Sequence, residues 1–228
     1  MAPINNRAGA KTPAGYRMLN RGNDHAEIYL YGIIGQDWYG DGVTAKQFAD
    51  DLKGLGKVKA IDCRINSEGG DVFAGKAMYT LLAEHEATVK VHIDGLAASA
   101  ASFIAMAGDE IRIAEGAFVM IHNAWTFAAG GADDMRRTAT LLDTVNETIR
   151  EVYVARTKNT AKAVKDWMDD ETWFAGKEAV SAGFADKLVE NLKVAACLSH
   201  GDRFKNLPSA LKPRRLAALT RLEALRRR

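Results

Sequence analysis

The sequence contains only two cysteines, Cys63 and Cys197, and their separation fits neither a metal-binding spacing nor a disulfide framework. Four prolines exclude a proline-rich linker protein. None of the five histidines forms an HxxxH or HExxH pair, so we do not expect a metal enzyme. The longest stretch of low charge, Gly95–Gly108, is too short to cross a membrane. With no signal-like apolar run at the start, we expect a soluble, cytoplasmic protein.

Composition and charge divide the chain into a folded body and a basic tail. The 228 residues are 47% hydrophobic and 26% charged, which is enough apolar material for a sizeable core and excludes wholesale disorder. The net charge of +2 hides an asymmetry, because the segment 203–228 carries nine Lys and Arg residues against one Glu. In that segment Leu216, Leu219, Leu222 and Leu225 recur among arginines, which predicts a basic amphipathic helix.

Hydrophobic periodicity predicts an α/β fold. Alternating or short apolar runs predict strands over residues 27–34, 58–66, 89–94, 111–114, 118–122 and 185–189. Helical spacing predicts helices over residues 44–55, 71–85, 99–107, 133–158, 161–168 and 177–182, with Thr44 as the N-cap of the first. Strands that alternate with helices of this length are typical of α/β units.

The long helix over residues 133–158 carries a heptad-like apolar stripe. Its members are Met135, Thr138, Leu142, Val145, Ile149 and Val152. The stripe has two interpretations of equal weight, which are packing against the same chain and contact with another subunit.

Two serines fall where a strand gives way to a helix of small residues, in the segment from Asp94 to Ser102. At such a junction Ser99 is exposed at the strand end and lies on the positive terminus of the helix, which suits a nucleophile or an oxyanion. The alternative is that Ser99 only caps the helix, and this segment alone favours that reading. Ser102 lies one turn later and is interpreted as a packing residue.

Three further segments could contribute to the same chemistry. Adjacent glycines in the segment 65–71 can offer backbone N–H groups to an oxyanion. His122 ends a buried strand. A lone histidine at such a position is more often a hydrogen-bonded structural residue than a catalytic base. The acidic cluster Asp169–Glu171 precedes an aromatic pair and could supply a carboxylate. Together they meet the requirements of a serine hydrolase, namely oxyanion donors, a nucleophile, a base and an orienting acid.

The segments 65–70 (INSEGG), 95–99 (GLAAS), 120–122 (MIH) and 178–186 (EAVSAGFAD) resemble those of the Clp protease proteolytic subunit, ClpP. From about residue 26 to 190 the chain resembles more closely the ClpP-related head maturation proteases of tailed phages and prophages. This resemblance implies a ClpP/crotonase-type spiral of ββα units with a protruding handle helix. The resemblance does not cover the two ends, so we expect a protease domain over 26–192, with composition predicting a flexible segment over 1–25 and a basic tail over 193–228.

The resemblance implies a role for each site residue. Ser99 matches the nucleophile, His122 the general base, and the backbone N–H groups of Gly70 and Ala100 the oxyanion hole. Glu171 falls on the catalytic acid when the motif is counted without gaps, and a shift of one or two residues would put Asp170 or Asp169 there. This chain has Glu68 where ClpP has Pro, which brings a negative charge near the expected oxyanion.

The expected function is that of a serine endopeptidase that processes capsid or scaffold proteins during prohead maturation, in the host cytoplasm or inside the prohead. It would form a homo-oligomeric ring, could use an AAA+ partner, and would need no metal or other cofactor. We expect neither nucleic-acid nor membrane binding. The alternatives are a general ClpP-type degradative subunit, a crotonase-like acyl-CoA enzyme, and an inactive ring-forming structural protein.

Overall fold

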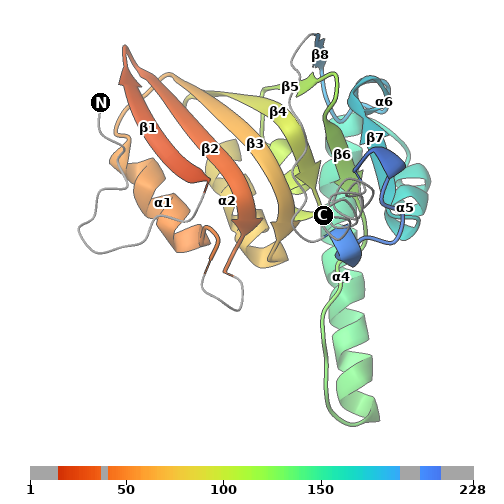
Figure 1. Cartoon of the computed structure of the whole chain (residues 1–228). Coiled ribbons are helices and arrows are strands. Elements are labelled where there is room, and N and C mark those ends of the chain that lie inside the picture. The colour runs from red at the N-terminus through yellow and green to blue at the C-terminus, as the bar shows by residue number, and fades with distance from the viewer. Residues whose placement is uncertain (1–14, 37–40, 191–200, 212–228) are drawn as a thin grey trace, which may run out of the picture.

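The strands form one sheet through the middle of the molecule (Figure 1). The computed structural model describes residues 15–36, 41–190 and 201–211. Strands β2, β3, β4, β5 and β8 run parallel in that order, with β1 antiparallel at the β2 edge, and β6 pairs with β4 and with β7. The strands are β1 (Tyr16–Gly22), β2 (His25–Ile34), β3 (Ala60–Gly70), β4 (Thr88–Ala98), β5 (Glu110–Ala114), β6 (Phe118–Ile121), β7 (Thr172–Ala175) and β8 (Lys187–Val189).

The helices begin close to where the sequence predicts, and side-chain caps account for some of these starts. The side chain of Thr44 accepts the N–H of Gln47 at 3.1 Å, and Asp71 accepts that of Ala74 at 2.7 Å, so both side chains satisfy backbone donors that the helix leaves unpaired. The helices are α1 (Ala45–Gly54), α2 (Val72–Ala83), α3 (Ala100–Ala105), α4 (Ala132–Thr157), α5 (Ala161–Asp169), α6 (Gly176–Ser181) and the 3-10 turns η1 (Gly201–Arg203) and η2 (Ser209–Leu211). The predicted alternation of strands and helices is confirmed.

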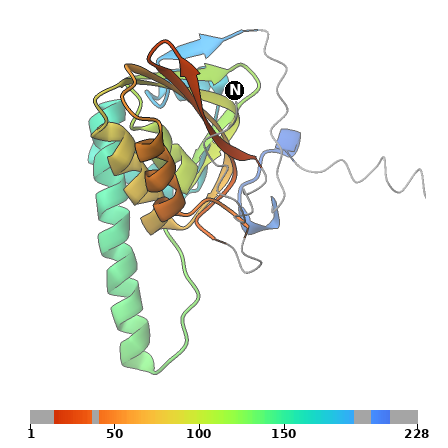
Figure 2. The ribbon, with the colours of Figure 1, turned by 90° about the vertical axis from the view of Figure 1, so that its left-hand side faces the viewer.

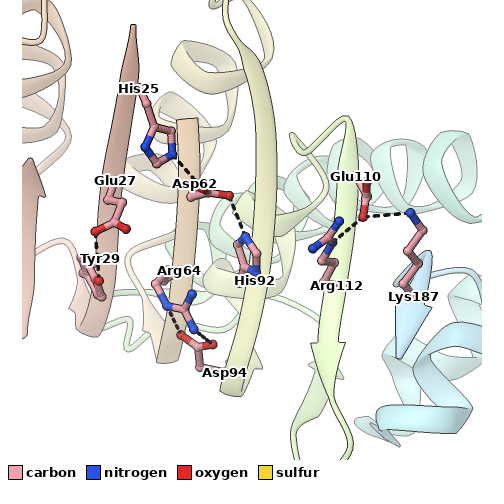
Figure 3. Close-up of polar contacts among 10 residues, drawn as sticks. All are labelled: His25, Glu27, Tyr29, Asp62, Arg64, His92, Asp94, Glu110, Arg112 and Lys187. Carbon is pink, nitrogen blue, oxygen red and sulfur yellow. Dashed lines mark hydrogen bonds and ion pairs between the residues drawn. The ribbon is translucent and has the colours of Figure 1, made fainter. Parts of the chain in front are cut away.

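The alternation in β3 divides the sheet into an apolar and a polar face. Ile61, Cys63 and Ile65 are buried in the core. Cys63 is a free core thiol, and burial raises its pKa to about 12. On the other face Asp62 lies between two histidines, 2.7 Å from Nε2 of His25 and 2.8 Å from Nε2 of His92 (Figure 3).

The N-terminal expectation was partly wrong. Residues up to 25 were expected to be flexible, but Tyr16–Gly22 forms β1, which pairs with β2. Tyr16 and Met18 are buried while Arg17 is exposed, which is the alternation of buried and exposed side chains expected of a strand. The run is short and lies among Asn, Gly and Arg residues, so the sequence did not reveal it. Residues 1–14, Cys197 and the predicted helix with Leu216, Leu219, Leu222 and Leu225 lie outside the described residues.

Helix α4 protrudes from the body as a handle (Figures 1 and 2). Its C-terminal half packs against the same chain, since Val145, Ile149 and Tyr153 are buried. Its N-terminal half is exposed, and Met135 and Leu141 face solvent there. The stripe therefore packs on its own chain along one half of the helix, and the other half leaves an apolar surface for which subunit contact stays a prediction.

Candidate active site

Ser99 and His122 lie side by side at the ends of two neighbouring parallel strands. Oγ of Ser99 is 2.8 Å from Nε2 of His122. The residues pair because β4 and β6 run parallel with Ala98 opposite Met120, so the chain positions just after each strand meet at one edge. The two side chains line a cavity of about 800 Å³. This is the hydroxyl–imidazole contact that a Ser/His pair needs for proton transfer.

The backbone at Ser99 is strained. Its φ is 53° and its ψ is −125°, a conformation that side-chain-bearing residues rarely adopt and that clusters at functional sites. The side chain makes no capping hydrogen bond to α3, so the helix-cap interpretation of Ser99 is wrong. Strand β4 also runs through Gly95 to Ala98, so the turn lies at Ser99 itself and not at the glycine.

Gly69 and Gly70, called the glycine loop below, end β3, and Gly69 packs directly against this turn. A Cβ on Gly69 would lie 2.6 Å from the carbonyl oxygen of Ala98 and 2.8 Å from Cβ of Ser99, so only glycine fits. Gly70 and Ala100, the expected oxyanion donors, line the same cavity as Ser99. Glu68 lines it as well.

The environment of His122 favours the neutral imidazole. Burial lowers the pKa of His122 below its usual value, and the charge of Lys205 lowers it further. The charge of Glu171 acts in the opposite direction. A neutral imidazole at pH 7 can accept a proton, as a general base must.

The three candidate acids differ in what they contact. Asp169 accepts from Asn123 at 2.8 Å and pairs with Lys165, on the surface. The side chain of Asp170 is exposed. Glu171 is buried, with 5% of its surface exposed, and is the one of the three that acts electrostatically on His122. In the described ranges, however, no hydrogen bond joins a carboxylate to His122.

The sequence did not reveal the residues that contact Glu171. Backbone N–H groups of Lys205 and Asn206 donate to its carboxylate at 3.0 and 2.7 Å, and Nε1 of Trp173 lies 3.4 Å away. Phe204 lines the cavity beside Ser99 and His122. Because backbone donors carry no sequence signature, the charge pattern of the tail gave no sign of this contact.

Ser102 lies behind the site as a packing residue, in agreement with its interpretation. Its side chain is buried and donates to the carbonyl oxygen of Ser99 at 2.7 Å. Among residues 15–36, 41–190 and 201–211, no cluster of His, Cys, Asp and Glu is suited to a metal ion. Within the same ranges, no helix is both long and apolar enough to span a bilayer.

Known proteins resemble this chain over the part that contains the site. A family model described as Clp protease matches residues 14–192. ATP-dependent Clp protease proteolytic subunit 2 of Bifidobacterium longum (strain NCC 2705) is 31% identical over 127 residues, which are 55% of this chain and 61% of that protein. The subunit of the same name from Nocardia farcinica (strain IFM 10152) is 28% identical over 137 residues, 59% of this chain and 68% of that protein.

The match to the family model covers well over half of the chain, from before β1 to beyond β8. It includes the glycine loop, Ser99, His122 and the acidic cluster. The α/β architecture expected from the sequence is thereby confirmed, and the match favours a protease over a crotonase-like acyl-CoA enzyme. The alignment with the Bifidobacterium protein spans less than two thirds of that protein's length. On its sequence and fold, the chain belongs to the Clp protease family.

Proposed function

We propose that the chain is a serine-type endopeptidase in which Ser99 is the nucleophile and His122 the general base. The observation that carries this proposal is the 2.8 Å contact between Oγ of Ser99 and Nε2 of His122. The strained turn at Ser99 supports it, because backbone strain of this kind clusters at functional sites. The lowered pKa of His122 supports it too, since a base must be unprotonated at working pH.

The proposed reaction is acyl transfer to serine followed by hydrolysis. The proton of Ser99 Oγ moves to Nε2 of His122 as Oγ bonds to the peptide carbonyl carbon. The protonated imidazole then donates that proton to the leaving amine as the C–N bond breaks. Water then attacks the acyl carbonyl carbon while Nε2 of His122 takes a proton from it. Oγ of Ser99 leaves and receives that proton, which restores the free enzyme.

The backbone N–H groups of Gly70 and Ala100 are the proposed oxyanion donors. Ala100 is the first residue of α3, and the helix offers no internal acceptor for an N–H at that position. Each such donor typically contributes about 3–4 kcal/mol of transition-state stabilisation. Glu68 opposes this effect to the extent that its charge faces the oxyanion.

Glu171 is the proposed third member, ahead of Asp170 and Asp169, because it alone is buried and acts on His122. In a chain that also carries Phe204→Ala, which loosens the segment bonded to Glu171, Glu171→Gln should slow modification of Ser99 by a fluorophosphonate probe at least tenfold, since an orienting carboxylate also stabilises the imidazolium. Asp170→Asn in the same background is the matched control and should not slow the reaction. Equal rates for both variants would remove Glu171 from the mechanism.

For the substrate we propose capsid or scaffold proteins of a phage prohead, cut by a homo-oligomeric ring in the host cytoplasm or within the prohead. The likeness of the motifs to head maturation proteases supports this assignment. The names of the two bacterial relatives favour a second candidate, a general ClpP-type degradative subunit that works with an AAA+ unfoldase. An inactive ring-forming protein is the third candidate.

Labelling and co-expression separate these candidates. A fluorophosphonate should modify the chain at Ser99, whereas an inactive ring would assemble without labelling. Mass spectrometry of co-expressed capsid and scaffold proteins should then show defined cuts that disappear with Ser99→Ala. Degradation of unrelated unfolded proteins only in the presence of an AAA+ unfoldase would instead support the degradative subunit.

A further inference from the structure

The described part of the C-terminal tail, residues 201–211, lies against the candidate active site beside β7 (Figure 1). Oε2 of Glu171 accepts the backbone N–H of Lys205 at 3.0 Å, and Oε1 accepts that of Asn206 at 2.7 Å. The Asn206 side chain also donates to the carbonyl oxygen of Asp170. Both carboxylate oxygens of the proposed acid are thus engaged by the tail.

The aromatic ring of Phe204 fixes the same segment over the base. Its centroid is 5.2 Å from the ring of Trp173, edge to face, and 6.5 Å from the imidazole of His122. Phe204 packs on a small apolar cluster formed by Leu96, Ala98 and Met120, and it lines the cavity that holds Ser99. An apolar contact and two backbone hydrogen bonds therefore hold the segment at the site.

This placement opposes catalysis in two ways. The carboxylate that should orient His122 is bonded to the tail, and no described residue bonds Nδ1 of His122. The positive charge of Lys205 disfavours the imidazolium that must form when His122 takes the proton of Ser99.

We propose that the segment Phe204–Asn206 is an autoinhibitory strap that holds Glu171 and covers His122 in cis, and that it must leave before the active site can act on a polypeptide. This inference rests on the proposed function. If the strap is absent from the site in only about a tenth of the molecules, Ser99 reacts about tenfold more slowly than it would in a chain without the strap. Release would free Glu171 to reach His122 and would open the cavity beside Ser99.

The test uses the full chain with single changes in the strap. Phe204→Ala removes the ring, and Asn206→Pro removes the N–H that Glu171 accepts. Asn206→Ala is the matched control, since it loses the same side chain and keeps that N–H. The readout is the rate at which a fluorophosphonate modifies Ser99, followed by intact mass, with the pKa of His122 measured by NMR as a second readout.

We expect Phe204→Ala and Asn206→Pro to react about tenfold faster than the unaltered chain, while Asn206→Ala, which loses only the side-chain bond to Asp170, should show a smaller increase. The pKa of His122 should rise in Phe204→Ala, because the imidazole loses its cover and the Lys205 charge moves away. If both variants react no faster while Ser99→Ala stays unmodified, the strap is refuted and the proposed function stands. If no variant, nor the unaltered chain, is modified, the proposed function falls and the strap with it.

Discussion

The backbone N–H of Ser99 donates to the carbonyl oxygen of Met120 at 2.9 Å. This bond joins the residue after β4 to the strand that ends just before His122. It continues the β4–β6 pairing by one step, so the register of the sheet sets the distance between the Ser99 and His122 side chains. The candidate catalytic contact is therefore a property of the sheet and not of a mobile loop.

Ser99→Ala should abolish fluorophosphonate labelling and leave the fold intact. Only the hydroxyl is lost, and the backbone bonds of residue 99 to Met120, Ser102 and Phe103 all remain. The free energy of unfolding should fall by only about 0.5–1.5 kcal/mol, since the one hydrogen bond lost is that to His122. Intact mass and urea unfolding measure the two effects. Labelling that persists in this variant would reject Ser99 as the nucleophile.

Ser102 and Tyr153 should show a stability effect that depends on both side chains. Their hydroxyls lie 2.8 Å apart in the core, and Ser102 also donates to the Ser99 carbonyl. Ser102→Ala leaves the Tyr153 hydroxyl buried without a partner and should cost about 1–3 kcal/mol, while Tyr153→Phe should cost about 1 kcal/mol. Denaturant unfolding of the double variant should show a loss smaller than the sum. Strict additivity would contradict the pairing.

Gly69→Ala should reduce the reactivity of Ser99 by more than tenfold. The new methyl group would lie 2.6 Å from the Ala98 carbonyl oxygen and 2.9 Å from the Ala100 nitrogen, which forces the turn to shift. Gly56→Ala is the matched control, because Gly56 also has a positive φ but a Cβ there meets nothing within 4 Å. Both changes incur the strain of a positive φ, about 1–2 kcal/mol, but only the first should slow labelling.

The labelling rate should rise with pH through an apparent pKa below 6.5, the ordinary value for histidine. Burial, followed by the Lys205 charge, lowers the pKa of His122, so the neutral base persists to lower pH. The same shift affects stability. Below pH 6.5 the unfolded chain binds a proton more readily, so the free energy of unfolding declines as pH falls toward the folded-state pKa. His122→Gln should remove this part of the pH dependence, and a rate limb at or above 6.5 would contradict the assignment.

The sequence predicted those parts of the site that local patterns determine. Ser99 and His122 each follow an apolar strand, and ends of parallel strands converge, so their contact could be anticipated. The positive φ of Ser99 could not, because strain is imposed by the packing of Gly69 and of α3 around it.

The partner of Glu171 was beyond sequence reasoning for a different reason. The contact with Lys205 and Asn206 joins positions more than thirty residues apart through backbone N–H groups, which every residue except proline possesses. Strand β1 was missed for the same reason. Its polar composition predicts a flexible segment, but pairing with β2 makes it a strand. Long-range pairing of ordinary groups leaves no local pattern to detect.

Arg64→Ala should destabilise the fold by about 3–5 kcal/mol, since it leaves a buried carboxylate without its cation. Asp94 is 3% exposed and accepts from Nε of Arg64 at 2.9 Å, on the polar face of the sheet (Figure 3). It also accepts from the Tyr31 hydroxyl at 2.6 Å. Burial and the Asp94 carboxylate raise the pKa of Tyr31 to about 12, so its hydroxyl stays a donor but cannot supply the missing charge.

An exposed ion pair provides the control for this prediction. Lys59 pairs with Asp24 at 2.6 Å, but the Lys59 side chain is 85% exposed, so Lys59→Ala should leave the free energy of unfolding nearly unchanged. Urea unfolding at pH 7 compares the two variants. Because Asp94 immediately precedes the segment that leads to Ser99, Arg64→Ala should also slow labelling, whereas Lys59→Ala should not. Equal stability of the two variants would show that water reaches Asp94 and replaces the guanidinium.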